Sequence, residues 1–192
     1  TMFKRLIGGL AVVLVAGAAS AATFSAAFYK VSGDRGNFDL ADAIGGVTAG
    51  NLKATFQSTV INYPRGGSDP DTNPTATTLA PFLNGDAGTL SFAGAPPSSG
   101  YDLNDSVFVF TGLVDLTGVD DLIVGSDDGF QLKLNGAVEG AAGRRSFNET
   151  SIDVSGMTGV ASLELLYFED SGNTGVTFEA RRAGATRRDF VQ

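Results

Sequence analysis

The sequence predicts an all-β fold that is dense in turns. The 192-residue chain contains 26 glycines, and its apolar residues fall in many short runs separated by turn residues. Short strand-like runs with glycine-rich turns are typical of all-β proteins. Hydrophobic residues make up 43% of the chain, which argues against disorder over most of it. The length suits one domain with a single hydrophobic core.

The composition excludes several kinds of chemistry. The chain has no histidine and no cysteine. Catalysis by Ser-His-Asp or Cys-His groups is therefore excluded, as are disulfides and thiolate metal sites. Any bound metal must be held by oxygen atoms, which points to calcium or magnesium. The net charge of −8 would repel nucleic-acid phosphates and anionic lipids, so neither is expected as a partner.

Residues 1–21 have the features of a signal peptide that is cleaved on secretion. Lys4 and Arg5 precede an apolar stretch, and Ala19-Ser20-Ala21 supplies the small residues of a cleavage site before Ala22. The apolar stretch is shorter than the ~20 residues that a membrane span needs. We therefore expect a secreted or cell-surface protein with no membrane span in the mature chain. A buried N-terminal helix or an uncleaved anchor is the alternative.

Apolar runs and alternating patterns predict strands over much of the remaining chain. The expected strands are 23–31, 52–61, 106–116, 121–126, 129–135, 151–154, 159–168 and 176–180. Short helical turns are expected in the N-terminal half, at 39–44 with Asp39 near the N-cap and at 79–83. Residues 62–78 read as a long polar loop, and residues 184–192 as a basic, solvated tail.

The sequence Ser-Asp-Asp-Gly-Phe at residues 126–130 places two adjacent carboxylates, Asp127 and Asp128, directly before an alternating strand. Two carboxylates this close repel each other unless a cation or a proton lies between them. A hard cation with oxygen ligands suits such a pair. The alternative is a structural turn, because aspartate side chains also bond their own backbone in turns.

Several sequence segments, taken in order along the chain, resemble segments of the PA14 domain superfamily and of its GLEYA-type and bacterial adhesin relatives. The matching segments are Val107 to Gly112, Gly125 to Leu132, Asn135-Gly136 and Leu163 to Glu169, with weaker matches at Phe28-Tyr29, Ile61 to Pro64 and Leu79 to Leu83. The resemblance covers most of the mature chain and defines an expected domain at residues 22–183. It implies a β-sandwich whose loops gather at one end.

The resemblance also implies a calcium site that receives sugar hydroxyls. Matching residue by residue places Asp127 and Asp128, joined by a cis peptide bond, at the ion. The second calcium-binding loop falls on residues 170–175, where Asn173 is the best match for the amide ligand and Asp170 is the alternative. Backbone carbonyls near residues 174 and 175 would assist. Calcium takes 6–8 oxygen ligands, so such a set leaves positions open for vicinal hydroxyls.

Aromatic side chains that could stack on a sugar are few, since the chain has no tryptophan. Tyr63 and Tyr101 are predicted to contact the ligand, and Phe147 is a further candidate. The loops at 62–78, 94–105 and 137–150 are expected to set the choice of sugar.

These features together predict a calcium-dependent carbohydrate-binding module of the lectin or adhesin type. The alternative is a structural subunit of an extracellular fibre, surface layer or matrix that self-associates through the same fold. An enzyme is not expected, because adjacent Asp side chains cannot flank a glycosidic bond as catalytic carboxylates do. Glu164, Glu169 and Glu179 could supply such a pair, but on strands they are expected to face solvent.

Overall fold

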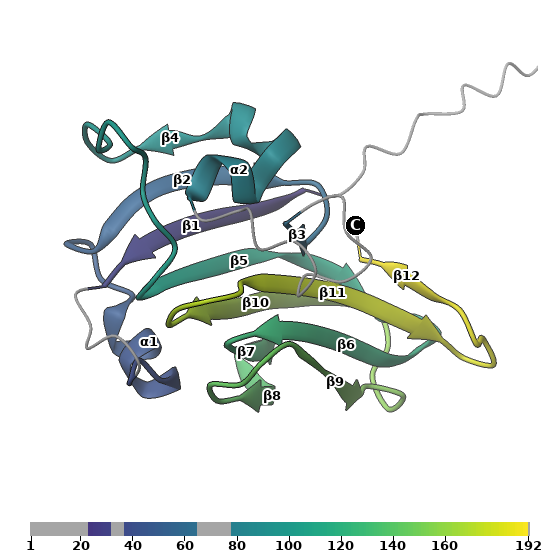
Figure 1. The fold of residues 1–192 in the computed structure, drawn as a ribbon. Coiled ribbons are helices and arrows are strands. Elements are labelled where there is room, and N and C mark those ends of the chain that lie inside the picture. Colours follow the sequence, from purple (N-terminus) through teal and green to yellow (C-terminus); the bar gives the residue numbers. More distant parts are fainter. Residues whose placement is uncertain (1–22, 32–36, 65–77, 192) are drawn as a thin grey trace, which may run out of the picture.

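The computed structural model describes residues 23–31, 37–64 and 78–191 (Figure 1). The predicted signal peptide and most of the polar loop at 62–78 lie outside the described residues. Strands dominate the described part, and they form two antiparallel sheets accompanied by two short α-helices. The prediction of an all-β sandwich with helical turns in the N-terminal half is confirmed.

The larger sheet contains seven strands and the smaller sheet five. The larger sheet runs β4 (Ser91–Phe92), β2 (Leu52–Ser58), β1 (Phe24–Lys30), β5 (Ser106–Asp115), β10 (Val160–Glu169), β7 (Gly129–Leu134) and β8 (Ala137–Ala142). The smaller sheet runs β12 (Arg188–Phe190), β11 (Gly175–Arg182), β6 (Val119–Asp127) and β9 (Asn148–Asp153), with β3 (Asn62–Tyr63) paired to β11. The helices are α1 (Leu40–Gly46) and α2 (Leu79–Leu83), and the 3-10 helix η2 (Asn84–Thr89) follows α2.

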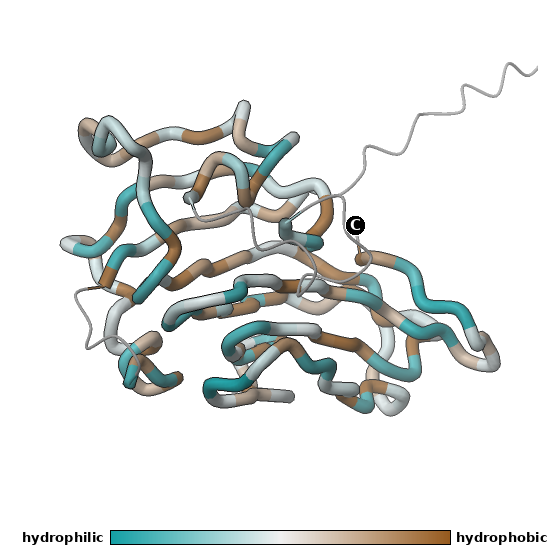
Figure 2. The backbone as a smooth tube through the Cα atoms, viewed as in Figure 1, coloured by the Kyte–Doolittle hydropathy of each residue, from teal (hydrophilic) through white to brown (hydrophobic). Residues whose placement is uncertain are grey.

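The sheets enclose an aromatic core centred on Phe108 of β5. Five rings have centroids between 5.0 and 6.5 Å from that of Phe108, namely Phe28, Phe56, Phe82, Phe110 and Tyr167. Such tilted and offset arrangements are the favoured geometries of aromatic pairs. Figure 2 shows hydrophobic residues recurring along the strands between the layers. The core therefore lies where the inward residues of both sheets meet.

Helix α1 covers the opposite face of the larger sheet at one end of β5. Its start is capped as predicted, because the Asp39 side chain accepts hydrogen bonds from the backbone N–H groups of Ala41 and Asp42. The helix region packs against Val107, which is fully buried, whereas Val109 further along β5 is only half-buried. The strand β5 is therefore buried on both faces only in its first half.

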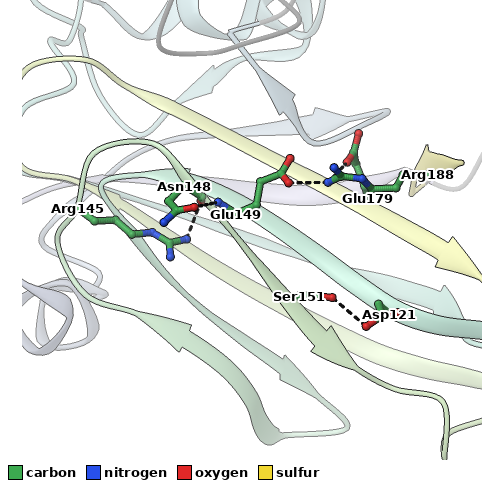
Figure 3. Close-up of polar contacts among 7 residues, drawn as sticks. All are labelled: Asp121, Arg145, Asn148, Glu149, Ser151, Glu179 and Arg188. Atoms are coloured by element: carbon green, nitrogen blue, oxygen red, sulfur yellow. Dashed lines mark hydrogen bonds and ion pairs between the residues drawn. The ribbon is translucent and has the colours of Figure 1, made fainter. Parts of the chain in front are cut away.

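The C-terminal segment departs from the predicted solvated tail. Residues 188–190 form β12, which pairs with β11, and Val191 is buried against the core. The Arg188 guanidinium lies 2.7 Å from Glu149 Oε2 and 3.4 Å from Glu179 Oε2, so it links β12 to β9 and β11 (Figure 3). The sandwich thus continues past the predicted boundary at residue 183. None of the described helices has the length and apolarity needed to cross a membrane.

The glycine of the Ser-Asp-Asp-Gly motif is required by close packing. A Cβ atom at Gly129 would collide with the carbonyl oxygen of Ala142 and would lie 2.5 Å from the Phe168 ring. We expect Gly129→Ala to lower the free energy of unfolding by about 2 kcal/mol, as overpacking does. Gly156→Ala is the matched control, since a Cβ there meets nothing within 4 Å. Urea unfolding measures both variants, and equal stabilities would contradict the packing argument.

Candidate metal centre

The candidate site lies where the chain crosses twice between the sheets. Asp127 ends β6 in the smaller sheet and Gly129 begins β7 in the larger one, so Asp127-Asp128-Gly129, here called the aspartate turn, spans the gap. Residues 170–174, here called the return loop, connect β10 back to β11. Gly175 pairs with Asp127 across β11 and β6, and this pairing sets the two connections side by side.

The aspartate turn presents two carboxylates in a largely buried position. The peptide bond between Asp127 and Asp128 is cis, as the resemblance implied. Each residue is only 6% exposed. Asp128 Oδ2 accepts a hydrogen bond of 2.6 Å from the backbone N–H of Asp170, which ties the turn to the return loop. Burial raises the pKa of the Asp128 carboxyl to about 6, and the charge of Asp170 adds to this effect.

A third carboxyl group, Glu169, lies behind the pair and is 1% exposed. Burial raises its pKa to about 9, and the charges of Asp128 and Asp127 raise it further, against the hydrogen bonds from Thr174 and Tyr167. Glu169 is therefore protonated at neutral pH. This corrects the expectation that Glu169 faces solvent on its strand. Of the two other glutamates, Glu164 pairs with Lys133 at 2.7 Å on a partly exposed surface.

The Tyr167 hydroxyl is the centre of a buried polar cluster. Its oxygen lies 2.5 Å from the Asp127 carbonyl oxygen, 2.6 Å from Thr174 Oγ1 and 3.0 Å from Glu169 Oε2. A phenol has one proton and a carbonyl oxygen can only accept, so the Tyr167 hydroxyl donates its proton to the Asp127 carbonyl oxygen. The contacts with Glu169 and Thr174 complete the cluster around this oxygen.

Two arginines attach the connection between β8 and β9 to this region. Arg144 Nη1 lies 3.1 Å from Asp170 Oδ2, and the backbone N–H of Phe38 donates to Asp170 Oδ1 at 3.2 Å. Arg145 donates to Ser126 Oγ at 3.1 Å. It also donates to the Asn148 carbonyl at 2.8 Å (Figure 3). The segment predicted as a loop at 137–150 is therefore largely β8 and the start of β9, with a short connection beside the aspartate turn.

The structure brings four of the predicted site positions into one region. Asp127 and Asp128 are adjacent and buried, and Asn173 lies exposed in the return loop that begins opposite them. The role of Asn173 as a ligand stays a prediction. Asp170 is also in the return loop, but its side chain already accepts from Phe38 and pairs with Arg144. Asp170 therefore supports the loop in this structure.

The predicted ligand-contacting tyrosines lie elsewhere in the sandwich. Tyr63 is 0% exposed and packs between Phe82 and Phe110, with its hydroxyl donating to Ser58 Oγ at 2.7 Å. The prediction for Tyr63 is wrong, because neither its ring nor its hydroxyl reaches the surface. Tyr101 is half-buried, and its ring packs against Phe28 at 5.9 Å. Its contact with a ligand stays a prediction.

Glu169, Tyr167 and Arg144 belong to the site but are not among the site residues that the sequence predicts. Glu169 could have been found, because alternation along β10 puts it on the same inward face as Tyr167. Tyr167 follows the apolar alternation of this strand, but the pattern does not say where its hydroxyl points. Arg144 follows no local pattern, since its partner Asp170 is 26 residues away.

The residues present fit a hard cation. All available side-chain donors around the aspartate turn are oxygen atoms, and the buried Glu169 Oε1 has no hydrogen-bond partner. In the described part of the chain, no three Asp or Glu side chains form a metal cluster by themselves. An ion at the turn would therefore need amide, backbone or ligand oxygens besides Asp127 and Asp128.

The raised pKa values predict that the metal-free protein loses stability as the pH rises. Glu169 holds its proton more tightly in the folded chain, so the loss begins near its unfolded pKa of 4.5 and ends near pH 9, and Asp128 contributes between 3.8 and about 6. We expect the free energy of unfolding to fall across this window, on the order of 5–10 kcal/mol, because each unit of raised pKa corresponds to about 1.4 kcal/mol. Glu169→Gln should flatten the dependence in urea unfolding with chelator present. Identical slopes for both proteins would contradict the assignment.

No protein-family model and no curated protein sequence matches the chain. Several solved structures do match the chain in fold. A PA14 sugar-binding domain from an RTX adhesin superposes with a TM-score of 0.65 at 22% identity, covering 89% of this chain and 95% of that one. The PA14 domain of the antifreeze protein MpAFP gives 0.64 at 22% identity, covering 88% and 86%. The A domain of epithelial adhesin 6 from Candida glabrata gives 0.52 at 10% identity, covering 92% and 87%. The chain therefore has a PA14-like fold.

Proposed function

We propose that this protein is a calcium-dependent carbohydrate-binding module of the adhesin type that acts outside the cell. The observation that carries the proposal is the pair of buried carboxylates, Asp127 and Asp128, held at the crossing between the sheets. The fold adds support, because one similar domain is described as sugar-binding and another was solved in complex with Galb1-3GlcNAc. These similar structures are binding domains, and adjacent Asp side chains do not suit glycoside hydrolysis.

The ion would be held by both aspartates of the turn, by Asn173 and by backbone carbonyls at residues 174 and 175. This set supplies oxygen atoms only and leaves coordination positions open. A bound calcium ion would offer those positions to two neighbouring sugar hydroxyls. Extracellular calcium modules bind with dissociation constants on the order of 0.1–1 mM, and we expect this range here.

The surrounding residues would keep the site rigid and partly dry. The N–H of Asp170 orients the Asp128 carboxylate, and Arg145 fastens Ser126 directly before the turn. Arg144 balances the charge of Asp170, which would otherwise add to the repulsion at the pair. The chain's own residues would thus hold two carboxylates ready for a cation without a third unbalanced charge beside them.

Calcium should stabilise the protein through the aspartate turn. At 10 mM calcium we expect a rise in the melting temperature of a few degrees, because an ion that binds only the folded state stabilises it by mass action. Asp127→Asn/Asp128→Asn should abolish the rise. Asp120→Asn/Asp121→Asn is the matched control, since it removes the same charge from a second adjacent pair, which lies on the strand that Asp127 ends. An equal rise in all three proteins would remove the metal site from the turn.

Sugar binding should depend on the same ion. On a glycan array we expect binding in calcium that is lost with a chelator and lost in Asp127→Asn/Asp128→Asn, but kept in the Asp120→Asn/Asp121→Asn control. Binding that persists with chelator would contradict the calcium-dependent function. An absence of binding under all conditions would contradict the carbohydrate proposal and would leave self-assembly, measurable by sedimentation, as the alternative.

A further inference from the structure

We propose that Tyr167 is the positioning residue of this site: its hydroxyl joins the aspartate turn to the return loop and holds the backbone of both segments in place for the ion. The inference rests on the proposed calcium function and deepens it. It assigns a role to a core side chain of β10 whose ring contacts nothing outside the protein, since Tyr167 is fully buried.

The hydroxyl lies where both segments meet. Tyr167 Oη donates to the carbonyl of Asp127 at 2.5 Å, contacts Thr174 Oγ1 at 2.6 Å and accepts from the N–H of Gly175 at 3.1 Å. Asp127 belongs to the turn, whereas Thr174 ends the return loop. One oxygen atom thus connects both crossings between the sheets.

The contact with the Asp127 carbonyl constrains both carboxylates. That carbonyl lies in one plane with the peptide nitrogen of Asp128. A hydrogen bond to its oxygen therefore restricts rotation of the peptide unit between the two Cα atoms. Since the side chains of Asp127 and Asp128 leave from these Cα atoms, holding the peptide plane limits the directions in which both carboxylates point.

The ring that carries the hydroxyl is itself fixed. Its centroid lies 5.6 Å from that of Phe108 and 6.4 Å from that of Phe82, with interplanar angles of 28° and 15°. The strand β10 is paired on both sides, with β5 and β7. A binding site supported by a locked side chain on a rigid strand is pre-organised, and partners that orient the groups holding a metal typically contribute 10–100-fold to its affinity.

A second buried tyrosine offers a matched comparison. Tyr63 is also 0% exposed, and its hydroxyl also contacts a carboxylate, that of Asp86, together with Ser58. It stacks on Phe110 in the same core. These two hydroxyl partners belong to neither the aspartate turn nor the return loop. Removing each hydroxyl therefore separates an effect on the site from an effect on core stability.

The test compares Tyr167→Phe with Tyr63→Phe by calorimetric calcium titration and by thermal unfolding of the metal-free proteins. We expect both variants to lose stability. Only Tyr167→Phe should raise the calcium dissociation constant, by about 10–100-fold. Thr174→Val, which removes a second hydroxyl of the cluster from a loop, should raise it by a smaller factor, with Thr177→Val on β11 as its control.

The outcomes are distinguishable. Wild-type protein that binds no calcium overturns the proposed function, and this inference with it. Calcium binding by the wild type that Tyr167→Phe and Thr174→Val retain in full overturns the positioning role alone. An equal loss of affinity in Tyr167→Phe and Tyr63→Phe also overturns it, because the effect would then follow core stability. A loss confined to the Tyr167 and Thr174 variants supports it.

Discussion

The aromatic contacts around Phe108 are the interaction on which the rest of the molecule depends. Phe108 lies on the central strand β5 and contacts rings from β1, α2 and β10 at once, so it joins the larger sheet to the segments that cover it. Aromatic side chains contribute large buried areas and favour defined relative orientations. The same contacts fix the ring of Tyr167, and through its hydroxyl the core determines where the backbone of the aspartate turn lies. The geometry of the site is therefore a consequence of packing.

Negative charge at the crossing is the main electrostatic cost of this arrangement. Asp127, Asp128, Glu169 and Asp170 are all buried within a few residues of the two connections. Three of the four are compensated, each in a different way. Glu169 keeps its proton, Asp170 pairs with Arg144, and Asp128 accepts a backbone N–H. The negative charge that is left without compensation is therefore concentrated at Asp127 and Asp128. This is the arrangement expected if a bound cation neutralises the pair.

Most of the fold could be predicted because its signals are local. Alternation identified β7 and β10, and the Asp39 cap identified α1, within one or two residues of their bounds. The candidate site was predictable only in its local part, the adjacent aspartates. Tyr63 was misplaced because a tyrosine in a loop-flanked position can point either way, and here Phe82 and Phe110 enclose it. The strand β12 escaped prediction although it pairs with the preceding strand β11, because its three residues are too few to show a periodic apolar pattern.

The double crossing also has a kinetic consequence. Tyr167 and Asp127 are 40 residues apart in the chain, and β1 reaches its partner β5 only across an even longer separation. Contacts between distant segments form slowly, because the entropy of closing the intervening loops is lost before the contacts stabilise the chain. The aspartate turn and the return loop lie side by side only when β6 is paired with β11 and β7 with β10. A chain that lacks these pairings holds the two aspartates but not the opposite wall of the site. Occupancy of the site would then report that these strands have paired.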